Sequence, residues 1–466
     1  MRGGATSNAL LRARPCRARS THLVHDARPT PAKLSQAARA GKMMGRGELL
    51  RRCAAAALLL LVLLSLWAPA SVLSSSSSSS SAAGAQAAPH HRRRYDAIFS
   101  LGDSYSDTGN GPVAFRWYNI TANPVMRPPY GSTFFGRPTG RNCDGRLAID
   151  FIAQSLGLPL VPPFLLVPPR TGAGAATTTS SSSFFRRGAN FAVGGATALD
   201  ASFFHRWDPP GGNTFPLNTS LGVQMQWFRS LKPSLCATTD DCKALFGRSL
   251  FFVGAFGAND YLLALAANKS VHEVRSFIPA VVTTISTAVE RLITEHGAAT
   301  VLVPGVIPMG CAPPVLAVFA DPDPAAYYPR TGCLKAINGL AAHHNALLED
   351  ALRGLRARHP AAAVVYADFF GTVMDMVTSP AKFGFAEDAL TLCCGGPGKF
   401  HYNRRVFCGD PGASKCRDPS ARLFWDGVHL TEAAYRYIAA DWLSAISSPP
   451  GGGAGTNNRT RSGATE

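Results

Sequence analysis

Short apolar runs alternate with longer, partly polar segments between residues 95 and 447. The short runs are rich in β-branched and aromatic residues and are bounded by Gly, Asp or Pro, a pattern typical of buried strands. In two longer segments, 277–293 and 334–355, apolar residues recur every three or four positions, which predicts amphipathic helices. The predicted strands cover residues 95–101, 189–193, 249–255, 299–306 and 362–368.

Strands that are apolar along their whole length and alternate with helices predict an α/β domain. Its central sheet should be parallel and covered by helices on both faces. Ligands of such sheets bind at the carboxyl ends of the strands. We therefore expect the chemistry of this protein directly after its predicted strands.

Low-complexity sequence flanks and interrupts this region. Residues 74–94 are rich in Ser and Ala and end in a basic stretch, which predicts a linker, and residues 448–466 predict a disordered tail. The stretch 170–183 predicts a solvated loop within the domain. We expect one folded domain, at residues 95–447.

A secretory leader is predicted before the linker. The basic stretch GRGELLRRC precedes a 14-residue apolar run and then small residues, as in a signal peptide. A membrane anchor is the alternative, but a spanning helix needs about 20 apolar residues, so we expect no stable anchor. We assign residues 43–73 to the signal peptide and predict that the basic extension 1–42 is not part of the mature protein.

Most of the net positive charge of the chain lies in and before the predicted leader. The net charge of +17 suggests a nucleic-acid partner, but residues 1–53 carry 12 Lys and Arg against two Asp and Glu. The rest of the chain is mildly basic and has no Lys/Arg stripe interleaved with aromatic residues, so we expect no nucleic-acid partner. Hydrophobic residues make up 46% of the chain, enough for a sizeable core.

Secretion into an oxidising compartment predicts that most of the cysteines are paired. Close spacing suggests the pairs Cys236 with Cys242 and Cys311 with Cys333, and the isolated Cys143 is left as the odd thiol. A zinc site is the alternative for the last four cysteines, but adjacent cysteines suit tetrahedral geometry poorly. We expect these four to pair among themselves, in an order left open: Cys393, Cys394, Cys408 and Cys416.

Four Asn-x-Ser/Thr sequons fit a secreted glycoprotein of the extracellular space or cell wall. They are expected glycosylation sites at Asn119, Asn218, Asn268 and Asn458.

Polar groups follow three of the predicted strands. Ser104 lies in a Gly-Asp-Ser turn after the first strand, Gly195 ends a Gly-Gly pair after the second, and Asn259 follows the third. Far downstream, Asp426 lies three residues before His429 and just before a predicted helix. Taken singly, each of these is a common turn or helix cap. Together, in this order, they supply every group that acyl transfer needs.

Acyl transfer needs a nucleophile, a base, a group that orients the base, and donors for the oxyanion. Ser104 can attack, His429 can take its proton, and Asp426 can hold the other imidazole nitrogen. The N–H groups of Ser104 and Gly195 and the side-chain amide of Asn259 can form the oxyanion hole. The Gly-x-Ser-x-Gly motif of α/β-hydrolases is absent, so a different scaffold is expected.

Other titratable residues have simpler interpretations. Asp103 and Asp107 resemble a paired-carboxylate glycosidase site, but local turn hydrogen bonds explain them. His343 and His344 lie on a helical pattern and are expected to be surface or packing residues.

Four stretches carry a family resemblance: FSLGDSYSDTGN, GANFAVGGAT, GAND and FWDGVHLTEAAY. They resemble the four blocks of the SGNH hydrolases, specifically of the plant-type GDSL esterase/lipases. Further stretches extend the resemblance over residues 95–445, among them PPYGSTFFGRPTGRNCDGR, VPGVIPMGCAPP and LTLCCGGPGKFHYN. One departure is Cys143, where the family more usually has a serine. This difference affects the expected pairing of the cysteines and not the expected catalytic residues.

The resemblance implies a three-layer α/β/α, flavodoxin-like sandwich and a serine esterase without metal or organic cofactor. It implies Ser104, Asp426 and His429 as the triad, and Gly195 and Asn259 as oxyanion donors. We expect a secreted monomer that acts on lipid esters, acylated metabolites or acetylated polysaccharide. The alternatives are an acyltransferase or a glycosidase on the same scaffold, or a catalytically silent binding protein.

Overall fold

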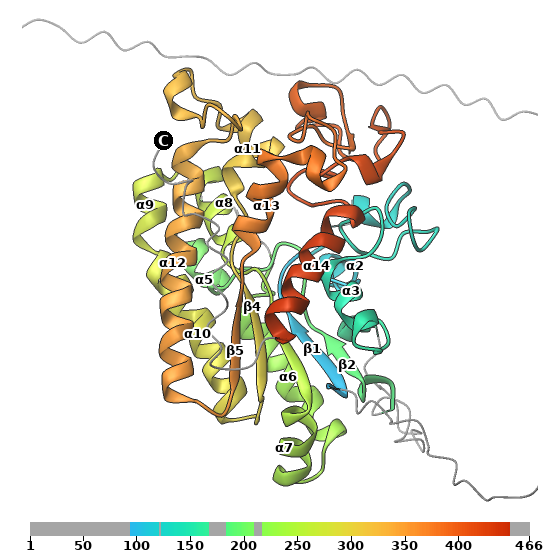
Figure 1. Cartoon of the computed structure of the whole chain (residues 1–466), viewed down its shortest axis with the longest axis vertical. Coiled ribbons are helices and arrows are strands. Elements are labelled where there is room, and N and C mark those ends of the chain that lie inside the picture. Colours follow the sequence, from blue (N-terminus) through green and yellow to red (C-terminus); the bar gives the residue numbers. More distant parts are fainter. Residues whose placement is uncertain (1–93, 121–122, 167–182, 209–216, 448–466) are drawn as a thin grey trace, which may run out of the picture. The chain divides into compact units, whose positions relative to one another are not determined.

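The computed structural model describes most of the expected domain (Figure 1). The expected extension, signal peptide and tail, the linker up to residue 93 and the sequon at Asn458 lie outside the described residues, as does most of the loop expected at 170–183. The described residues are 94–120, 123–166, 183–208 and 217–447.

Five parallel strands form the central sheet, in the order β2-β1-β3-β4-β5. Every residue of β1 and β3 is buried, as expected for strands covered on both faces. This is a flavodoxin-like strand order, and the predicted three-layer α/β/α sandwich is confirmed. The strand bounds are Ala97–Leu101 (β1), Gly188–Asn190 (β2), Ser249–Val253 (β3), Thr300–Pro304 (β4) and Ala363–Ala367 (β5).

Helices form the two outer layers (Figure 1). On one face α10 (Ile278–Thr294) packs against both α6 (Leu221–Leu235) and α12 (Lys335–Arg358), and on the other α14 (Glu432–Ser447) packs against α3 (Ala148–Ser155). The other α-helices of the described residues are α2 (Gly111–Trp117), α5 (Ala201–His205), α7 (Thr239–Gly247), α8 (Ala258–Ala266), α9 (Val271–Ser276), α11 (Pro313–Val318) and α13 (Phe369–Thr378). Short 3₁₀ helices cover Pro124–Met126, Phe164–Leu166, Met309–Cys311, Pro324–Ala326, Pro380–Phe383, Lys399–His401 and Pro419–Ala421.

Polar residues set several helix starts. The Ser220 hydroxyl accepts a hydrogen bond from the N–H of Val223 at the start of α6. Thr238 with Asp241 and Ser270 with Glu273 form capping boxes at the starts of α7 and α9. Such caps satisfy N–H groups that the helix itself leaves unpaired.

The second strand is shorter than predicted. The expected strand covers residues 189–193, but β2 ends at Asn190. Beyond it, the Asn190 side chain accepts a hydrogen bond from the N–H of Ala192, and the Asn110 amide donates to the Ala192 carbonyl. The N–H groups of Phe191 and Val193 still donate to the carbonyls of Ser100 and Gly102, so side chains bond the Ala192 backbone while main-chain bonds to the β1 segment continue as far as Val193. The other predicted strands and the two predicted helices match the observed ones within three residues.

The segment Val271–Thr294, which contains α9 and α10, is long and apolar enough by composition to cross a membrane. Its apolar residues have another use, because α10 buries one face, including Val281, Ile285 and Val289, against the core. We therefore regard it as a core helix of the sandwich.

Four disulfides link eight of the nine cysteines that follow the leader. They join Cys236 to Cys242, Cys311 to Cys333, Cys393 to Cys416 and Cys394 to Cys408. Cys143 is unpaired and buried. The last two disulfides hold a lobe that contains the two-stranded sheet of β6 (Cys394–Gly395) and β7 (Ser414–Lys415). All four of its sulfurs are used in disulfides, which leaves none for the alternative zinc site.

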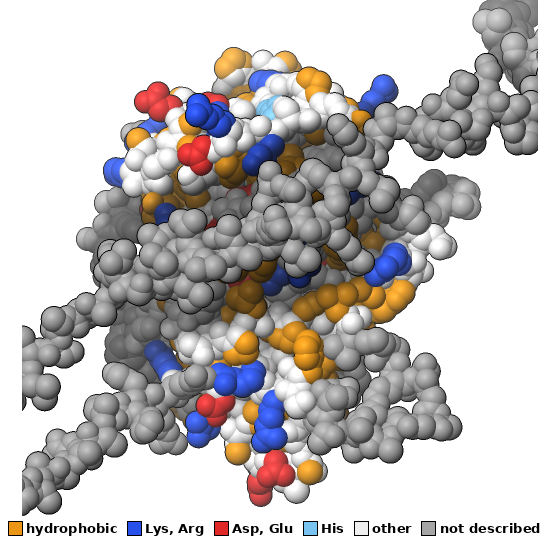
Figure 2. Space-filling model, turned by 90° about the vertical axis from the view of Figure 1, so that its right-hand side faces the viewer, with side chains coloured by type: hydrophobic (Ala, Val, Ile, Leu, Met, Phe, Trp, Pro, Cys, Tyr) orange, Lys and Arg blue, Asp and Glu red, His pale blue; other side chains and the backbone are white. Residues whose placement is uncertain are grey.

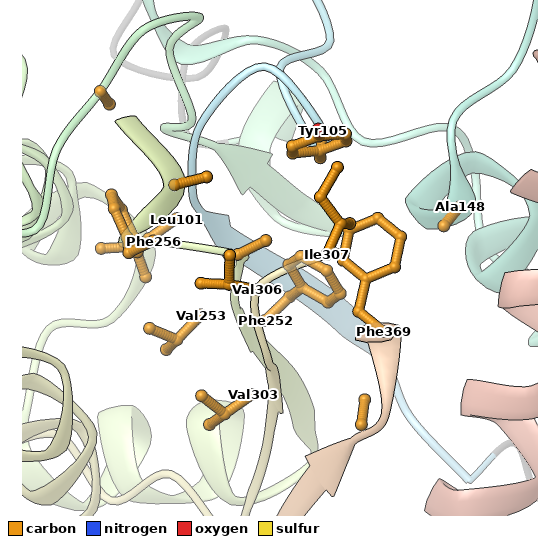
Figure 3. Packing of buried hydrophobic residues seen from close by; sticks show 14 of the residues in the cluster. Leu101, Tyr105, Ala148, Phe252, Val253, Phe256, Val303, Val306, Ile307 and Phe369 are labelled. Atoms are coloured by element: carbon orange, nitrogen blue, oxygen red, sulfur yellow. The ribbon is translucent and has the colours of Figure 1, made fainter. Parts of the chain in front are cut away.

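Apolar side chains pack tightly around the carboxyl ends of the strands (Figure 3). Tyr105, Ile307 and Phe369 lie together there, and the Tyr105 and Phe369 rings meet edge to face at 5.3 Å between centroids. All three are buried. The loops that follow the strands therefore pack against a buried apolar cluster.

Basic side chains are scattered over the surface. On the face seen in Figure 2, the Lys and Arg side chains of the described residues lie singly or in small groups among acidic and apolar side chains. The expectation of no nucleic-acid partner stays a prediction.

Candidate active site

The loop after β1 presents Ser104. Gln224 of α6 holds this loop at its base, because its side chain accepts a hydrogen bond from the N–H of Gly102 and donates one to the Gly102 carbonyl, both at 2.8 Å. The N–H of Tyr105 then donates to the Asp103 carboxylate at 3.0 Å. Ser104 is 7% exposed, and neither its hydroxyl nor its N–H bonds to any residue that the structure describes. Both groups are thus free to act on a substrate.

We expect Gln224→Met to destabilise the protein by about 1–3 kcal/mol, because the buried N–H of Gly102 loses its partner and the Gly102 carbonyl keeps only its bond from the N–H of Val193. Turnover should fall as well, since Gly102 lies two residues before Ser104. Urea denaturation and kcat measure the two effects. Gln226→Met is the matched control, because Gln226 lies on the same helix and is exposed. Equal stability of the two variants would contradict the role of Gln224.

His429 and Asp426 form a close pair on the loop before α14. The Nδ1 atom of His429 lies 2.6 Å from Asp426 Oδ1. The N–H of Trp425 donates to the His429 carbonyl at 2.8 Å, which closes the loop. The hydroxyl of Tyr105 donates to the carbonyl of Val428 at 2.9 Å, and its ring lies 5.8 Å from the His429 ring. The structure thus brings His429 against the residue that follows Ser104.

Burial and charge oppose each other at His429. Burial lowers the pKa of the imidazole, but the charge and hydrogen bond of Asp426 and the charge of Asp103 raise it, and the net pKa lies above the ordinary 6.5. Burial raises the pKa of Asp103 to about 7, against the Tyr105 N–H and His429, which lower it. Asp426 and, when it is ionised, Asp103 therefore both favour the protonated form of His429.

The pH dependence of hydrolysis should report this pKa. Only neutral His429 can take a proton, so kcat/KM for an uncharged ester should fall on acidification, with a midpoint above 6.5. Initial rates from about pH 5 to about pH 9 measure the profile. A midpoint at or below 6.5 would show that Asp426 and Asp103 do not outweigh the effect of burial on the His429 pKa.

Two candidate oxyanion donors, Gly195 and Asn259, lie close to the loop that carries Ser104. Gly194 is so close that a Cβ atom on it would lie 3.7 Å from the Ser104 Cβ. Gly195 has a φ of +82°, a conformation that favours glycine, and its N–H makes no hydrogen bond to the described residues. The Asn259 amide donates to the Ala196 carbonyl at 2.9 Å and lies 3.5 Å from Asp103 Oδ2. The structure therefore gathers N–H donors from three strand ends.

Two carboxylates hold this arrangement together. Asp107 accepts four backbone N–H bonds, from Gly109, Asn110, Gly111 and Gly194, at 2.7–2.8 Å. Burial raises the pKa of Asp107 to about 6, although these bonds lower it. Asp260, next to Asn259, accepts the N–H groups of Ala198 and Leu199.

The prediction of local turn bonds for Asp107 covers three of its four partners. The fourth, Gly194, lies 87 residues away in the sequence. No pattern in a single sequence indicates that partner, although both residues lie in stretches already singled out.

The contact between Tyr130 and Asp426 was also not predicted from the sequence. The hydroxyl of Tyr130 donates to Asp426 Oδ2 at 2.5 Å. Tyr130 lies in the stretch PPYGS, which carries part of the family resemblance but no catalytic signal of its own. His344, in contrast, is buried with its Nδ1 atom 2.6 Å from the Tyr261 hydroxyl, and burial lowers its pKa to about 3. It packs inside the sandwich, as expected.

Comparison with known proteins gives consistent results. The family described as GDSL-like Lipase/Acylhydrolase matches residues 98–442. The chain is 42% identical over 358 residues to GDSL esterase/lipase At5g45910 of Arabidopsis thaliana, which covers 77% of this chain and 92% of the relative. It is 40% identical over 359 residues to GDSL esterase/lipase At1g28600 of the same plant, covering 76% of this chain and 86% of the relative.

Proposed function

Because this chain belongs to the family of GDSL-like lipases and acylhydrolases and is a carboxylic ester hydrolase, we propose that Ser104 is its nucleophile. His429 is the general base and Asp426 orients it. The observation that carries this proposal is the Asp426–His429 hydrogen bond of 2.6 Å, with the His429 ring against Tyr105. Asp426 occupies Nδ1, so Nε2 is left to face a substrate.

The proposed reaction has two halves. The Ser104 oxygen attacks the ester carbonyl while His429 Nε2 takes the hydroxyl proton, and the tetrahedral intermediate carries the negative charge on its oxygen. His429 then gives the proton to the leaving alcohol, which departs and leaves an acyl-enzyme. Water attacks this acyl group, again with His429 as base, and the acid and free Ser104 are released.

The N–H groups of Ser104 and Gly195 and the amide of Asn259 stabilise the oxyanion in both halves. The support is that the N–H groups of Ser104 and Gly195 have no partner among the described residues, that Gly194 lies next to Ser104, and that the Asn259 amide lies 3.5 Å from Asp103, the residue before Ser104. Donors held in place before the reaction need no reorganisation as the charge develops, which makes them effective.

Active-site labelling tests the proposal directly. A fluorophosphonate probe should modify the folded protein at Ser104, because only an activated serine reacts with it. Peptide mapping by mass spectrometry identifies the modified residue, and heat-denatured protein is the control. A folded protein that stays unlabelled, or carries the label on another serine, would support a silent binding protein or a different nucleophile.

We propose that the substrates are esters with short acyl groups, from acylated metabolites, acetylated polysaccharide or lipids. The support is the lack of a long apolar lid segment in the sequence of the domain. Turnover of p-nitrophenyl esters from acetyl to palmitoyl, together with acetylated xylan, tests this. A preference for long chains would overturn the short-acyl assignment, and product transfer to added alcohols would indicate an acyltransferase.

We also propose that the protein is a secreted, glycosylated monomer with its domain at residues 95–447. Four disulfides support an oxidising compartment, and Asn119, Asn218 and Asn268 are exposed. N-terminal sequencing of the protein collected outside expressing cells should find a start after residue 73. Retention inside the cells with an intact leader would contradict secretion.

A further inference from the structure

Tyr130 completes the coordination of the Asp426 carboxylate. Oδ1 of Asp426 bonds to His429 at 2.6 Å, and Oδ2, the oxygen that His429 leaves free, accepts the Tyr130 hydroxyl at 2.5 Å. Tyr130 lies 296 residues before Asp426 in the sequence and is 2% exposed. Each oxygen of the carboxylate therefore has its own donor.

The surroundings keep Tyr130 in this position. Its ring meets the ring of Trp425, the residue before Asp426, edge to face at 5.8 Å. Its N–H donates to the Arg127 carbonyl, and the N–H of Gly131 donates to the Cys143 carbonyl. The disulfide-linked lobe supports the other side, because the N–H of Cys394 donates to the Trp425 carbonyl at 2.7 Å. Tyr130 and Asp426 thus belong to one rigid, largely apolar cluster.

The hydroxyl can only donate to this carboxylate. Burial and the charge of Asp426 raise the pKa of Tyr130 well above 10, so the phenol keeps its proton. A hydrogen bond to a charged acceptor is stronger than a neutral one, and a buried carboxylate oxygen without a donor is costly. The bond therefore fixes the plane of the carboxylate and draws charge away from the oxygen that faces His429.

We propose that Tyr130 is a positioning residue for ester hydrolysis, which acts through Asp426 on His429. This inference rests on the proposed catalytic function of Ser104, Asp426 and His429. Tyr130 does not touch the reacting atoms. It holds Asp426 Oδ1 in line with the imidazole and limits how strongly Asp426 stabilises the imidazolium.

Other titratable groups also face this pair. Asp103 and Tyr105, on the loop after β1, lie near His429. Asp410 and Cys143 lie on the Tyr130 side. All four side chains are retained when only the Tyr130 hydroxyl is removed. A shift in the pH profile of that variant can therefore be assigned to the bond between Tyr130 and Asp426.

Tyr130→Phe keeps the ring against Trp425 and removes only the hydroxyl. We expect kcat to fall about ten- to a hundredfold with KM nearly unchanged, because the carboxylate that orients the base loses one charge-assisted hydrogen bond. The acid midpoint of kcat/KM should move to higher pH. Without the Tyr130 hydroxyl, the negative charge of Asp426 acts more strongly on His429, which raises the pKa of the imidazole. Rates are normalised to the fraction of sites that a fluorophosphonate probe titrates. A midpoint that stays in place or falls would overturn the proposal, even if kcat is lower.

Tyr95→Phe is the matched control. Tyr95 is 4% exposed just before β1, and its hydroxyl has no hydrogen-bond partner among the described residues, so its removal should leave kcat and the pH profile unchanged. A double-mutant cycle with Asp426→Asn provides a second test. Tyr130→Phe should cost much less in that background, because the two residues act as a unit, and fully additive losses would count against the proposal.

The test separates this inference from the proposed function. If Ser104→Ala stays active, the proposed function fails. If Ser104→Ala is inactive and Tyr130→Phe behaves like the unmodified enzyme, only the role of Tyr130 fails.

Discussion

Ser104→Ala should abolish ester hydrolysis and leave the fold intact. Loss of a serine nucleophile lowers kcat by roughly 10⁴- to 10⁶-fold in serine hydrolases. The hydroxyl of Ser104 bonds to none of the described residues, so its removal leaves no buried partner unsatisfied. The unfolding temperature should therefore stay close to that of the unmodified protein. Turnover of p-nitrophenyl acetate and thermal unfolding measure the two quantities.

Ser106→Ala is the matched control for this experiment. Ser106 lies two residues further along the same loop, is 1% exposed, and its hydroxyl has no hydrogen-bond partner among the described residues. That variant should keep nearly full activity. Normal turnover by Ser104→Ala would show that another residue attacks the ester.

Asn259→Ala is expected to have the second largest effect. Removal of one oxyanion donor costs about a hundred- to a thousandfold in kcat, with KM changing much less, because the charge forms only as the reaction proceeds. The Asn259 amide donates to the Ala196 carbonyl at 2.9 Å and, over a longer 3.5 Å, to Asp103 Oδ2, and the weaker of these two bonds can be exchanged for one to the oxyanion. Steady-state kinetics with an acetyl ester measures both constants.

Asn259→Asp separates the donor from the shape of the side chain. Aspartate is close in size but cannot donate when ionised and places a negative charge beside the oxyanion, so its activity should be no higher than that of the alanine variant. An active Asn259→Asp enzyme would show that Asn259 serves the loop structure and not the oxyanion.

Much of the architecture follows from local sequence. The strands around β1 and β3 are apolar throughout, and that pattern both predicts a strand and requires cover on two faces. Because parallel strands end at the same edge, the positions after them were predicted to contain the chemistry, and the structure gathers Ser104, Gly195 and Asn259 there. The strand β2 is the exception, since it ends at Asn190 and the side chains of Asn110 and Asn190 bond the Ala192 backbone beyond it.

The pairing of the last four cysteines could not be predicted from their spacing in the sequence. Spacing left the order open, and the structure pairs Cys393 with Cys416 and Cys394 with Cys408. Successive side chains of an extended segment point to opposite sides, so adjacent cysteines reach different partners. Which partner lies on which side depends on the path of the whole lobe.

The sequence by itself determined the residue types that we propose for the chemistry, their order and the strand ends to which they belong, because side-chain identity and hydrophobic period are local properties. Only the tertiary structure decided which side chains hold them in place. Gln224 meets Gly102, Asp107 meets Gly194, and Tyr130 meets Asp426, across separations of 122, 87 and 296 residues. A hydrogen bond depends on distance and angle in the folded chain, and no spacing along the sequence encodes those.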